Sequence, residues 1–175
     1  MNVFILNTGR CGSTTFIKAC EHIDNYTSGH ESRLKIPGKT RLSYPANHIE
    51  ADNRLSWLLG RLDQSYGDDA FYVHLSRDKA DTVDSFVKRR QMGIIKSWRE
   101  GVYLDASTDD RLLAEDYIDT VNANIRLFLQ NKKHQMQFSL EQARQQFAEF
   151  WRLIGAEGNL EQALKEWDIR HNKST

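Results

Sequence analysis

A short apolar run followed at once by a turn rich in glycine and hydroxyl residues constrains the fold most strongly. Residues 3–6 are Val, Phe, Ile and Leu, as expected for a strand that is buried on both faces of a parallel sheet. Residues 7–15 contain two glycines and four hydroxyl side chains, which predicts a turn. A helix is expected to follow, through residues 16–20. A strand buried on both faces needs helices on either side, which favours an α/β fold.

The rest of the chain predicts further alternation of strands and helices. Residues 32–48 contain both prolines and are expected to form a loop. Residues 91–105 lack clean periodicity, and we interpret them as a loop or lid. The pattern predicts one α/β domain, residues 1–175, with a mainly parallel central sheet flanked by helices and a ligand beyond the carboxyl ends of its strands. The predicted strands are 26–29, 70–75 and 136–138, and the predicted helices run through about 50–66, 83–87, 113–128, 140–154 and 160–167.

Residues 8–15 combine the groups that a phosphate-binding loop needs. Gly9 and Gly12 let the backbone turn tightly and approach a ligand closely. The first N–H groups of the following helix have no partners inside the helix, and they lie at the positive end of its dipole. Arg10 adds a fixed cation, and the hydroxyls of residues 13–15 add donors. We therefore expect an anion to bind at this turn.

This turn differs from the phosphate loop of a nucleotide kinase. That loop ends in Lys followed by Ser or Thr, whereas here the cation, Arg10, precedes the second glycine. The strand predicted at residues 70–75 ends in Ser76 and Arg77 rather than in an acidic residue, and an arginine there would repel Mg²⁺. A metal-dependent triphosphate site is therefore disfavoured.

A second motif lies at the end of that strand. Arg77 follows the strand directly, and Ser85 lies eight positions later on the predicted next helix. An arginine at the carboxyl end of a parallel strand points into the crevice where such sheets bind ligands. A serine one to two turns into the helix can bring its hydroxyl toward the same anion. Taken singly, Arg77 could instead pair with Asp78 or Asp81, and the serine could face solvent.

Together the two motifs resemble the signature of the sulfotransferases that use 3′-phosphoadenosine 5′-phosphosulfate (PAPS). Residues 8–15 look like the 5′-phosphosulfate loop of that superfamily, with Arg10 at the position of its Lys or Arg. The later Arg and Ser match the pair that holds the 3′-phosphate of the donor there. The resemblance follows most of the chain in order, but close matches cover only these two motifs. By this resemblance the donor-binding residues are Arg10, Cys11, Gly12, Ser13, Thr14, Thr15, Arg77 and Ser85.

The resemblance implies a P-loop-like, three-layer α/β fold and an enzyme that transfers a sulfuryl group. The donor would be PAPS, the product 3′-phosphoadenosine 5′-phosphate (PAP), and the acceptor a hydroxyl group of a small molecule or glycan. Sulfuryl transfer depends on positioning and charge stabilisation, as phosphoryl transfer does, so no metal is expected. Arg10 and the helix N-terminus would stabilise the charge that develops on the leaving 5′-phosphate during in-line transfer.

The base that activates the acceptor hydroxyl must stand opposite the leaving group, and two residues fit. Glu31 follows the predicted second strand and resembles the catalytic Glu of several Golgi-type sulfotransferases. His48 resembles the histidine base of the cytosolic branch, and histidine has the better unperturbed pKa. Glu31 could instead pair with Arg33 or Lys35, and His48 could cap a helix beginning near residue 50. We rank Glu31 first and keep His48 as the alternative.

Composition argues against several other classes of protein. Lys plus Arg equals Asp plus Glu at 24 each, so the chain lacks the basic excess typical of proteins that coat nucleic acid. Cys11 and Cys20 lie too close to the amino terminus to suggest a disulfide framework, and two cysteines are too few for a metal cluster. No apolar run approaches the roughly 20 residues that cross a bilayer, and the first residues lack a signal-peptide pattern. We therefore expect a cytoplasmic protein with no nucleic-acid partner and no membrane span, of undetermined oligomeric state.

Two other functions stay open. A small nucleotide or adenylylsulfate kinase also places a phosphate loop after its first strand, and metal dependence would distinguish it. A non-catalytic nucleotide-binding module would bind the donor without transferring the sulfuryl group, and changes at Glu31 and His48 would not affect that binding. The basic tail, residues 170–174, resembles the basic segment that many sulfotransferases have late in the chain to donate hydrogen bonds to the 3′-phosphate. The alternative is a frayed terminus.

Overall fold

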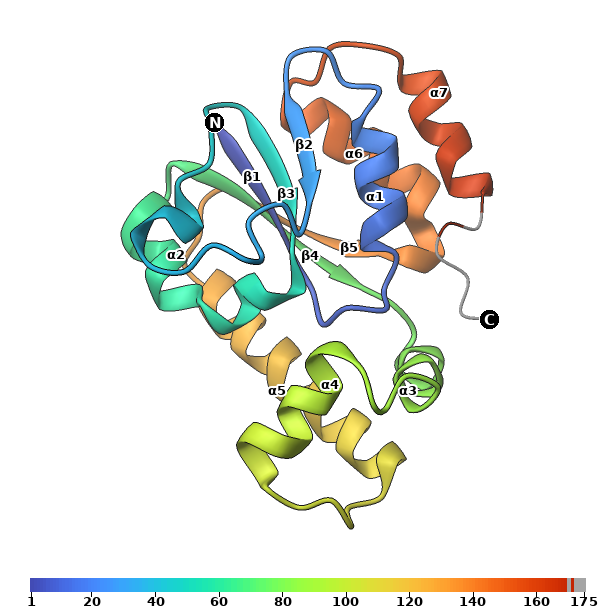
Figure 1. The fold of residues 1–175 in the computed structure, drawn as a ribbon. Coiled ribbons are helices and arrows are strands. Elements are labelled where there is room, and N and C mark those ends of the chain that lie inside the picture. Colours follow the sequence, from blue (N-terminus) through green and yellow to red (C-terminus); the bar gives the residue numbers. More distant parts are fainter. Residues whose placement is uncertain (170, 172–175) are drawn as a thin grey trace.

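A parallel sheet of five strands forms the middle of the molecule (Figure 1). The computed structural model describes residues 1–169 and residue 171. The strands are β1 (Asn2–Leu6), β2 (Thr27–His30), β3 (His48–Ala51), β4 (Ala70–Ser76) and β5 (Gln135–Ser139). Their order in the sheet is β2-β3-β1-β4-β5, and every pair of neighbours is parallel. The first strand of the chain is therefore the central one.

Helices cover both faces of this sheet and give three layers (Figure 1). One face packs against α1, α6 and α7, and the other packs against α2, α3, α4 and α5. The helices are α1 (Ser13–Cys20), α2 (Leu59–Tyr66), α3 (Lys79–Val87), α4 (Gly93–Trp98), α5 (Asp110–Leu129), α6 (Ala143–Leu153) and α7 (Leu160–Lys165). Within the described residues, none of these helices has the length and apolar character needed to span a bilayer.

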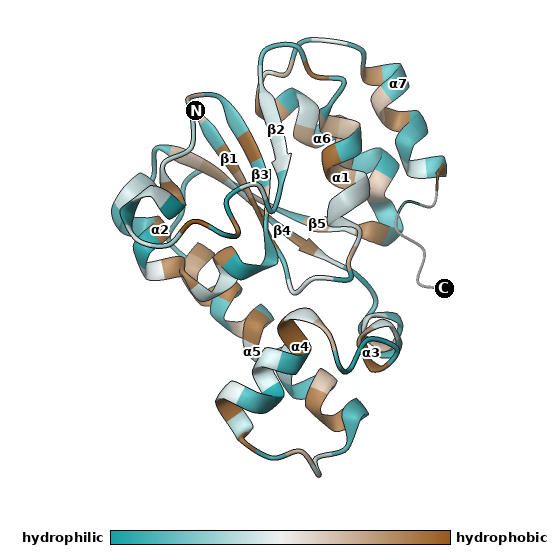
Figure 2. Ribbon diagram, viewed as in Figure 1, coloured by the Kyte–Doolittle hydropathy of each residue, from teal (hydrophilic) through white to brown (hydrophobic). Residues whose placement is uncertain are grey.

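The two faces of the sheet bury two separate apolar cores. Successive residues of a strand point to opposite faces, so Val3 and Ile5 belong to the core under α1 and α6, whereas Phe4 and Leu6 belong to the core under α5. All four side chains are fully buried. Figure 2 shows the apolar stretches of β1 and β4 enclosed between more hydrophilic helices. The prediction of an α/β fold whose first strand is buried on both faces is confirmed.

The predicted and observed elements differ in two places. Residues 48–51 were expected to end a loop and begin a helix, but they form β3, and helical structure starts later, with a 3₁₀ turn at Asn53–Trp57 and then α2. A four-residue strand that carries a buried His and Glu has no apolar run to mark it, and it exists because β1 and β2 pair with it. Residues 91–105, expected to be a loop or lid, contain α4 and a π-helical turn at Arg99–Tyr103.

Phe16 joins α1 to the core on its side of the sheet, and its truncation tests that core. Its ring lies 5.0 Å from the ring of Phe138 and 5.0 Å from that of Phe150, measured between centroids, and it is fully buried. We expect Phe16→Ala to lower the free energy of unfolding by about 3–5 kcal/mol, because it removes apolar burial and leaves a cavity. Urea denaturation measures the change. Leu153→Ala, at an exposed site, should cost far less, and equal losses in the two variants would contradict this core.

Candidate functional site

A cavity of about 1000 Å³ opens where four strands end. Because the strands are parallel, the residues that follow β1, β2, β3 and β4 all reach the same edge of the sheet. The cavity is lined by residues from each of these four connections, by Leu140 directly after β5, by residues between 81 and 89 on α3 and just after it, and by the last described residues of the chain. Its volume is at the upper end of the range for ligand pockets.

The turn after β1 takes a backbone path that depends on its glycines. Gly9, Arg10 and Gly12 have φ angles of 86°, 62° and 93°, in the left-handed region. A Cβ atom on Gly9 would lie 2.7 Å from the side-chain nitrogen of Asn53, and one on Gly12 would lie 2.7 Å from Leu140. No larger residue fits at either glycine without moving its neighbours. The turn can therefore expose its backbone to the cavity.

Buried side chains from distant elements hold this turn in place. The Asn7 side chain accepts a hydrogen bond from the Gly9 amide at 2.8 Å. The hydroxyl of Tyr117, on α5, donates to the Thr8 carbonyl at 2.8 Å, and that of Ser56 donates to the Asn7 carbonyl at 3.0 Å. Burial raises the pKa of Tyr117, so its hydroxyl stays protonated and remains a donor. The core thus determines the shape of the turn.

The N-terminus of α1 faces the cavity, and within the described residues no side chain caps it. Gly12 occupies the N-cap position and has no side chain to cap the helix, and the first turn contains no acidic residue. Residues 12–15 line the cavity, and the Ser13 hydroxyl lies 3.0 Å from Nε2 of His30, at the end of β2. The positive end of the helix dipole is therefore available to an anion.

Three arginines gather at one side of the cavity. Nε of Arg10 donates to the Ser85 hydroxyl at 2.9 Å, which joins the turn after β1 to α3. Burial lowers the pKa of Arg10, and the nearby charges of Arg89 and Arg77 lower it further. Like charges held this close create a positive potential that an anion would relieve. The sequence motifs around Arg10, Arg77 and Ser85 therefore meet at one point.

Arg77 also forms the ion pair that its sequence neighbours predicted. Its Nη2 lies 2.9 Å from Oδ2 of Asp81, one turn into α3, and its Nη1 lies 3.5 Å from the carbonyl oxygen of Arg10. The Asp81 side chain is 59% exposed, so this pair is screened by water and contributes little stability. Arg77 still lines the cavity, and its guanidinium retains further donors.

Glu31 lies at the end of β2 and lines the same cavity. Its φ angle is 52°, a left-handed conformation that is uncommon for a residue other than glycine. Its amide donates to the Ala51 carbonyl at 3.0 Å, and its Oε2 lies 3.2 Å from Nη1 of Arg54. The carboxylate thus pairs with an arginine that follows β3 rather than with Arg33 or Lys35.

A buried carboxylate holds the residue next to Glu31. The Glu50 side chain, on β3, is fully buried and accepts hydrogen bonds from the amide and hydroxyl of Ser32 at 2.7 and 2.5 Å. Ser32 directly follows Glu31, so these two bonds determine how the chain leaves β2. The two donors of Ser32 thus satisfy oxygens of a side chain that is buried away from water.

His48 lies at the other end of β3, away from the cavity. Its ring is buried between the Thr27 hydroxyl, 2.8 Å from Nδ1, and Oε2 of Glu50, 3.0 Å from Nε2, and it stacks on Tyr44. Ala51 lies three positions further along the strand, about 10 Å away at the usual rise. The structure therefore brings Glu31, and not His48, to the cavity that Arg10 lines.

Cys11 is the one predicted donor-binding residue that does not line the cavity. Its side chain is buried in the core under α1, and burial raises the pKa of its thiol to about 12. The other predicted donor-binding residues do line it. Of the predicted basic tail, Arg170 and residues 172–174 lie outside the described residues, whereas His171 lines the cavity and its Nε2 lies 2.8 Å from Oε2 of Glu166.

The cavity includes residues that the sequence did not reveal. Asn53 escaped notice because it follows β3, a strand without an apolar signal, and His30 because β2 has only a weak one. Trp167 comes from the end of the chain and packs edge-on against Phe16. The sequence pattern that could have revealed His30 is the run of Gly, His and Glu at the end of the predicted second strand.

Comparisons with known proteins point to one fold. No protein-family model matches the chain, and no curated protein matches it significantly in sequence. The crystal structure of mouse sulfotransferase SULT7A1 complexed with PAP matches it with a TM-score of 0.58 at 13% sequence identity. The chain has a sulfotransferase-like fold. The match covers 95% of this chain but 62% of the mouse protein, so this chain spans less than two thirds of that protein's length.

Tyr117 offers a test of how the core shapes the turn after β1. We expect Tyr117→Phe to cost about 1–3 kcal/mol of stability, because the buried Thr8 carbonyl loses its hydroxyl partner. Amide hydrogen exchange at residues 8–12 should be faster in this variant than in the wild type. Tyr72→Phe is a matched control, since it removes a hydroxyl that donates to the Gly67 carbonyl at 2.9 Å, away from the turn. Equal exchange at residues 8–12 in the two variants would contradict the role of Tyr117.

Proposed function

We propose that the protein is a sulfotransferase that moves a sulfuryl group from PAPS to a hydroxyl acceptor without a metal ion. The observation that carries the proposal is the meeting, in one cavity, of the turn after β1, the Arg77–Ser85 motif and Glu31. The sulfotransferase-like fold supports it, because a PAP-bound sulfotransferase shares this arrangement of strands and helices.

The turn after β1 fits the phosphosulfate end of the donor. Gly9, Arg10 and Gly12 line the cavity, the α1 N-terminus is not capped by a side chain, and Arg10 adds a guanidinium. We assign residues 12–15 and Arg10 to the 5′-phosphate and the sulfuryl oxygens, because these groups donate hydrogen bonds and carry positive charge. Cys11 is not assigned to the donor, because its side chain is buried in the core beneath the turn.

The second motif fits the 3′-phosphate. Arg77 and Ser85 reach the cavity from β4 and α3, and Lys88 and Arg89 line it one turn further along. A phosphate at this point would replace mutual repulsion among the cations with charge-assisted hydrogen bonds. Arg10, bonded to Ser85, lies between the two phosphate positions and can respond to both.

We assign the transfer step to Glu31 as general base. The bound donor supplies an activated sulfuryl group. Glu31 removes the proton from the acceptor hydroxyl as the acceptor oxygen forms its bond to sulfur. The bond between sulfur and the oxygen of the 5′-phosphate breaks, and its electron pair leaves with PAP. Arg10 and the α1 N-terminus stabilise the added negative charge on that phosphate. The proton remains on Glu31 until product leaves.

Glu31 is preferred to His48 because of where the two side chains lie. Glu31 lines the cavity, whereas both ring nitrogens of His48 already have protein partners in a buried site at the far end of β3. A general base has to come within hydrogen-bond reach of the proton that it removes. The ion pair with Arg54 holds the Glu31 carboxylate at the cavity edge until an acceptor hydroxyl arrives.

Binding of PAP in the absence of metal tests the donor site. We expect wild-type protein to bind PAP in EDTA, and Arg77→Ala to weaken binding about 10- to 100-fold, because a charged hydrogen bond to phosphate is worth about 1.5–3 kcal/mol. Isothermal titration calorimetry measures both affinities. Arg152→Ala, at an exposed site on α6 outside the cavity lining, is the matched control and should bind as the wild type does.

The same titration separates the alternative functions. Binding of ATP only with Mg²⁺, and no binding of PAP by folded protein, would favour a nucleotide kinase and overturn the proposal. Tight PAP binding without sulfuryl transfer to any acceptor in a broad panel of alcohols, phenols and sugars would indicate a non-catalytic module.

Glu31→Gln tests the base. We expect it to lower the rate of transfer of radiolabelled sulfuryl from PAPS by about 10²- to 10⁴-fold, because the amide cannot accept the proton. PAP affinity should stay at the wild-type value, since Glu31 is not assigned to the phosphates. His48→Gln tests the alternative base in the same assay. A loss of this size in His48→Gln, with full activity in Glu31→Gln, would contradict the assignment.

A further inference from the structure

Lysines without a carboxylate partner are not spread evenly over the surface. Within the described part of the chain, the side chains of Lys35, Lys39 and Lys88 form no ion pair or hydrogen bond. Lys88 lines the cavity, and the other two belong to the loop that follows Glu31 directly. The lysines that do pair with a carboxylate are Lys18, Lys79, Lys96, Lys132, Lys133 and Lys165.

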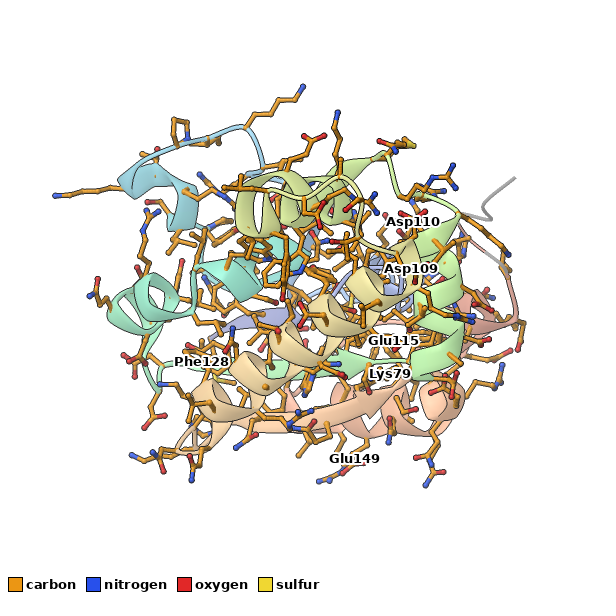
Figure 3. The ribbon with its side chains drawn as sticks, turned by 90° about the horizontal axis from the view of Figure 1, so that it is seen from below. Lys79, Asp109, Asp110, Glu115, Phe128 and Glu149 are labelled. Carbon is orange, nitrogen blue, oxygen red and sulfur yellow. The ribbon has the colours of Figure 1, made fainter. Side chains whose placement is uncertain are left out.

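The loop of residues 32–47, here called the basic loop, has positive charges and no negative ones. It contains two lysines and two arginines, and neither Asp nor Glu. The chain as a whole carries equal numbers of basic and acidic residues, so this loop is a local excess. Many of the acidic residues lie far from this loop in the chain, among them Asp109, Asp110 and Glu115. Figure 3 shows these three residues and the light blue basic loop on opposite sides of the view.

The arginines of this region shape the basic loop, which leaves its lysines for another role. Arg33 donates to the Thr40 carbonyl at 3.0 Å and stacks on the Tyr44 ring. Arg61, on α2, donates to the Gly38 carbonyl at 2.6 Å. Arg41 is buried and forms an ion pair with Asp52. The loop is therefore folded back on itself and tied to the body of the protein, with Lys35 and Lys39 exposed on it.

We propose that the acceptor carries an anionic group, a carboxylate, sulfate or phosphate, that binds Lys35 and Lys39 while its hydroxyl reaches Glu31. The inference rests on the proposed transfer to a hydroxyl acceptor. Lys35 lies four residues beyond Glu31, so their Cα atoms are at most about 14 Å apart. The acceptor thus holds its anionic group at a distance that an oligosaccharide, a glycoside or a phosphorylated polyol spans.

Two further features favour such an acceptor over an anionic membrane surface. Leu34 and Ile36, each 37% exposed, alternate with the cations and can pack against the carbon skeleton of a bound molecule. Membrane recognition by charge usually needs clusters of about 4–8 basic residues, whereas the basic loop offers two unpaired lysines. The basic loop also begins directly after Glu31, the residue assigned as the base, near which an acceptor has to lie.

The test uses matched anionic and neutral probes on protein saturated with PAP, so that the donor site is already filled. Amide NMR spectra are recorded during titration with glycerol phosphate and with methyl β-glucuronide, and then with glycerol and methyl β-glucoside. We expect saturable shifts in residues 32–40 for the two anions and none for their neutral partners. Raising the ionic strength from about 0.01 M to about 1 M should weaken the binding of both anions, because the Debye length falls from about 30 to about 3 Å.

Charge-neutral variants connect the shifts to the two lysines. We expect Lys35→Gln/Lys39→Gln to weaken anion binding about tenfold or more, since it removes two charged donors. PAP affinity should not change. The matched control is Lys18→Gln/Lys165→Gln, which removes the same charge from α1 and α7 at exposed positions, and it should bind the anions as the wild type does.

Three results would overturn the proposal: no saturable shift with either anion, equal shifts with the neutral probes, or equal loss in both double variants. Binding to vesicles of phosphatidylcholine and phosphatidylserine that requires both lysines, without any response to the soluble anions, would also overturn it in favour of a membrane surface. Failure of PAP binding is measured separately and bears on the proposed function, because the same titrations on PAP-free protein still report on the basic loop.

Discussion

The parallel direction of all five strands is the constraint on which the cavity depends. Parallel neighbours end at a common edge, so connections that lie far apart in the sequence meet there. Arg10 follows β1, Glu31 follows β2, Asn53 follows β3 and Arg77 follows β4, and all four line one cavity. An antiparallel strand at any of these positions would carry its residue to the opposite edge. The position of β1 at the centre places the turn with the most donors in the middle of the cavity.

Two non-glycine residues at this edge, Arg10 and Glu31, have left-handed backbone conformations, with φ angles of 62° and 52°. Such conformations cost of order 1–3 kcal/mol each and persist where surrounding bonds hold them. Tyr117 holds the Arg10 turn from α5, and the buried Glu50 holds the chain after Glu31 through Ser32. The core therefore positions both side chains through groups that need not touch a ligand.

The sequence predicted most of the fold because its strands and helices have strong local patterns. The apolar runs at 3–6 and 70–75 needed no distant information, and the turn at 8–15 followed from the chemistry of glycine and of helix N-termini. β3 could not be predicted, because its His48 and Glu50 are polar residues whose burial is possible only with Thr27 and Ser32 as partners. That missing strand made His48 resemble a loop residue near the site.

The sequence by itself determined most of the strands and helices, the turn at residues 8–15 and the eight-residue spacing of Arg77 and Ser85, since each depends on residues that are near in the chain. Only the tertiary structure decided that Glu31 lies at the cavity and His48 does not, and that the basic loop keeps two lysines unpaired within the described residues. The physical reason is strand pairing. The hydrogen bonds of β3 with β1 and β2 set which end of each strand faces the cavity, and pairing between segments so far apart in the chain leaves no local pattern in the sequence.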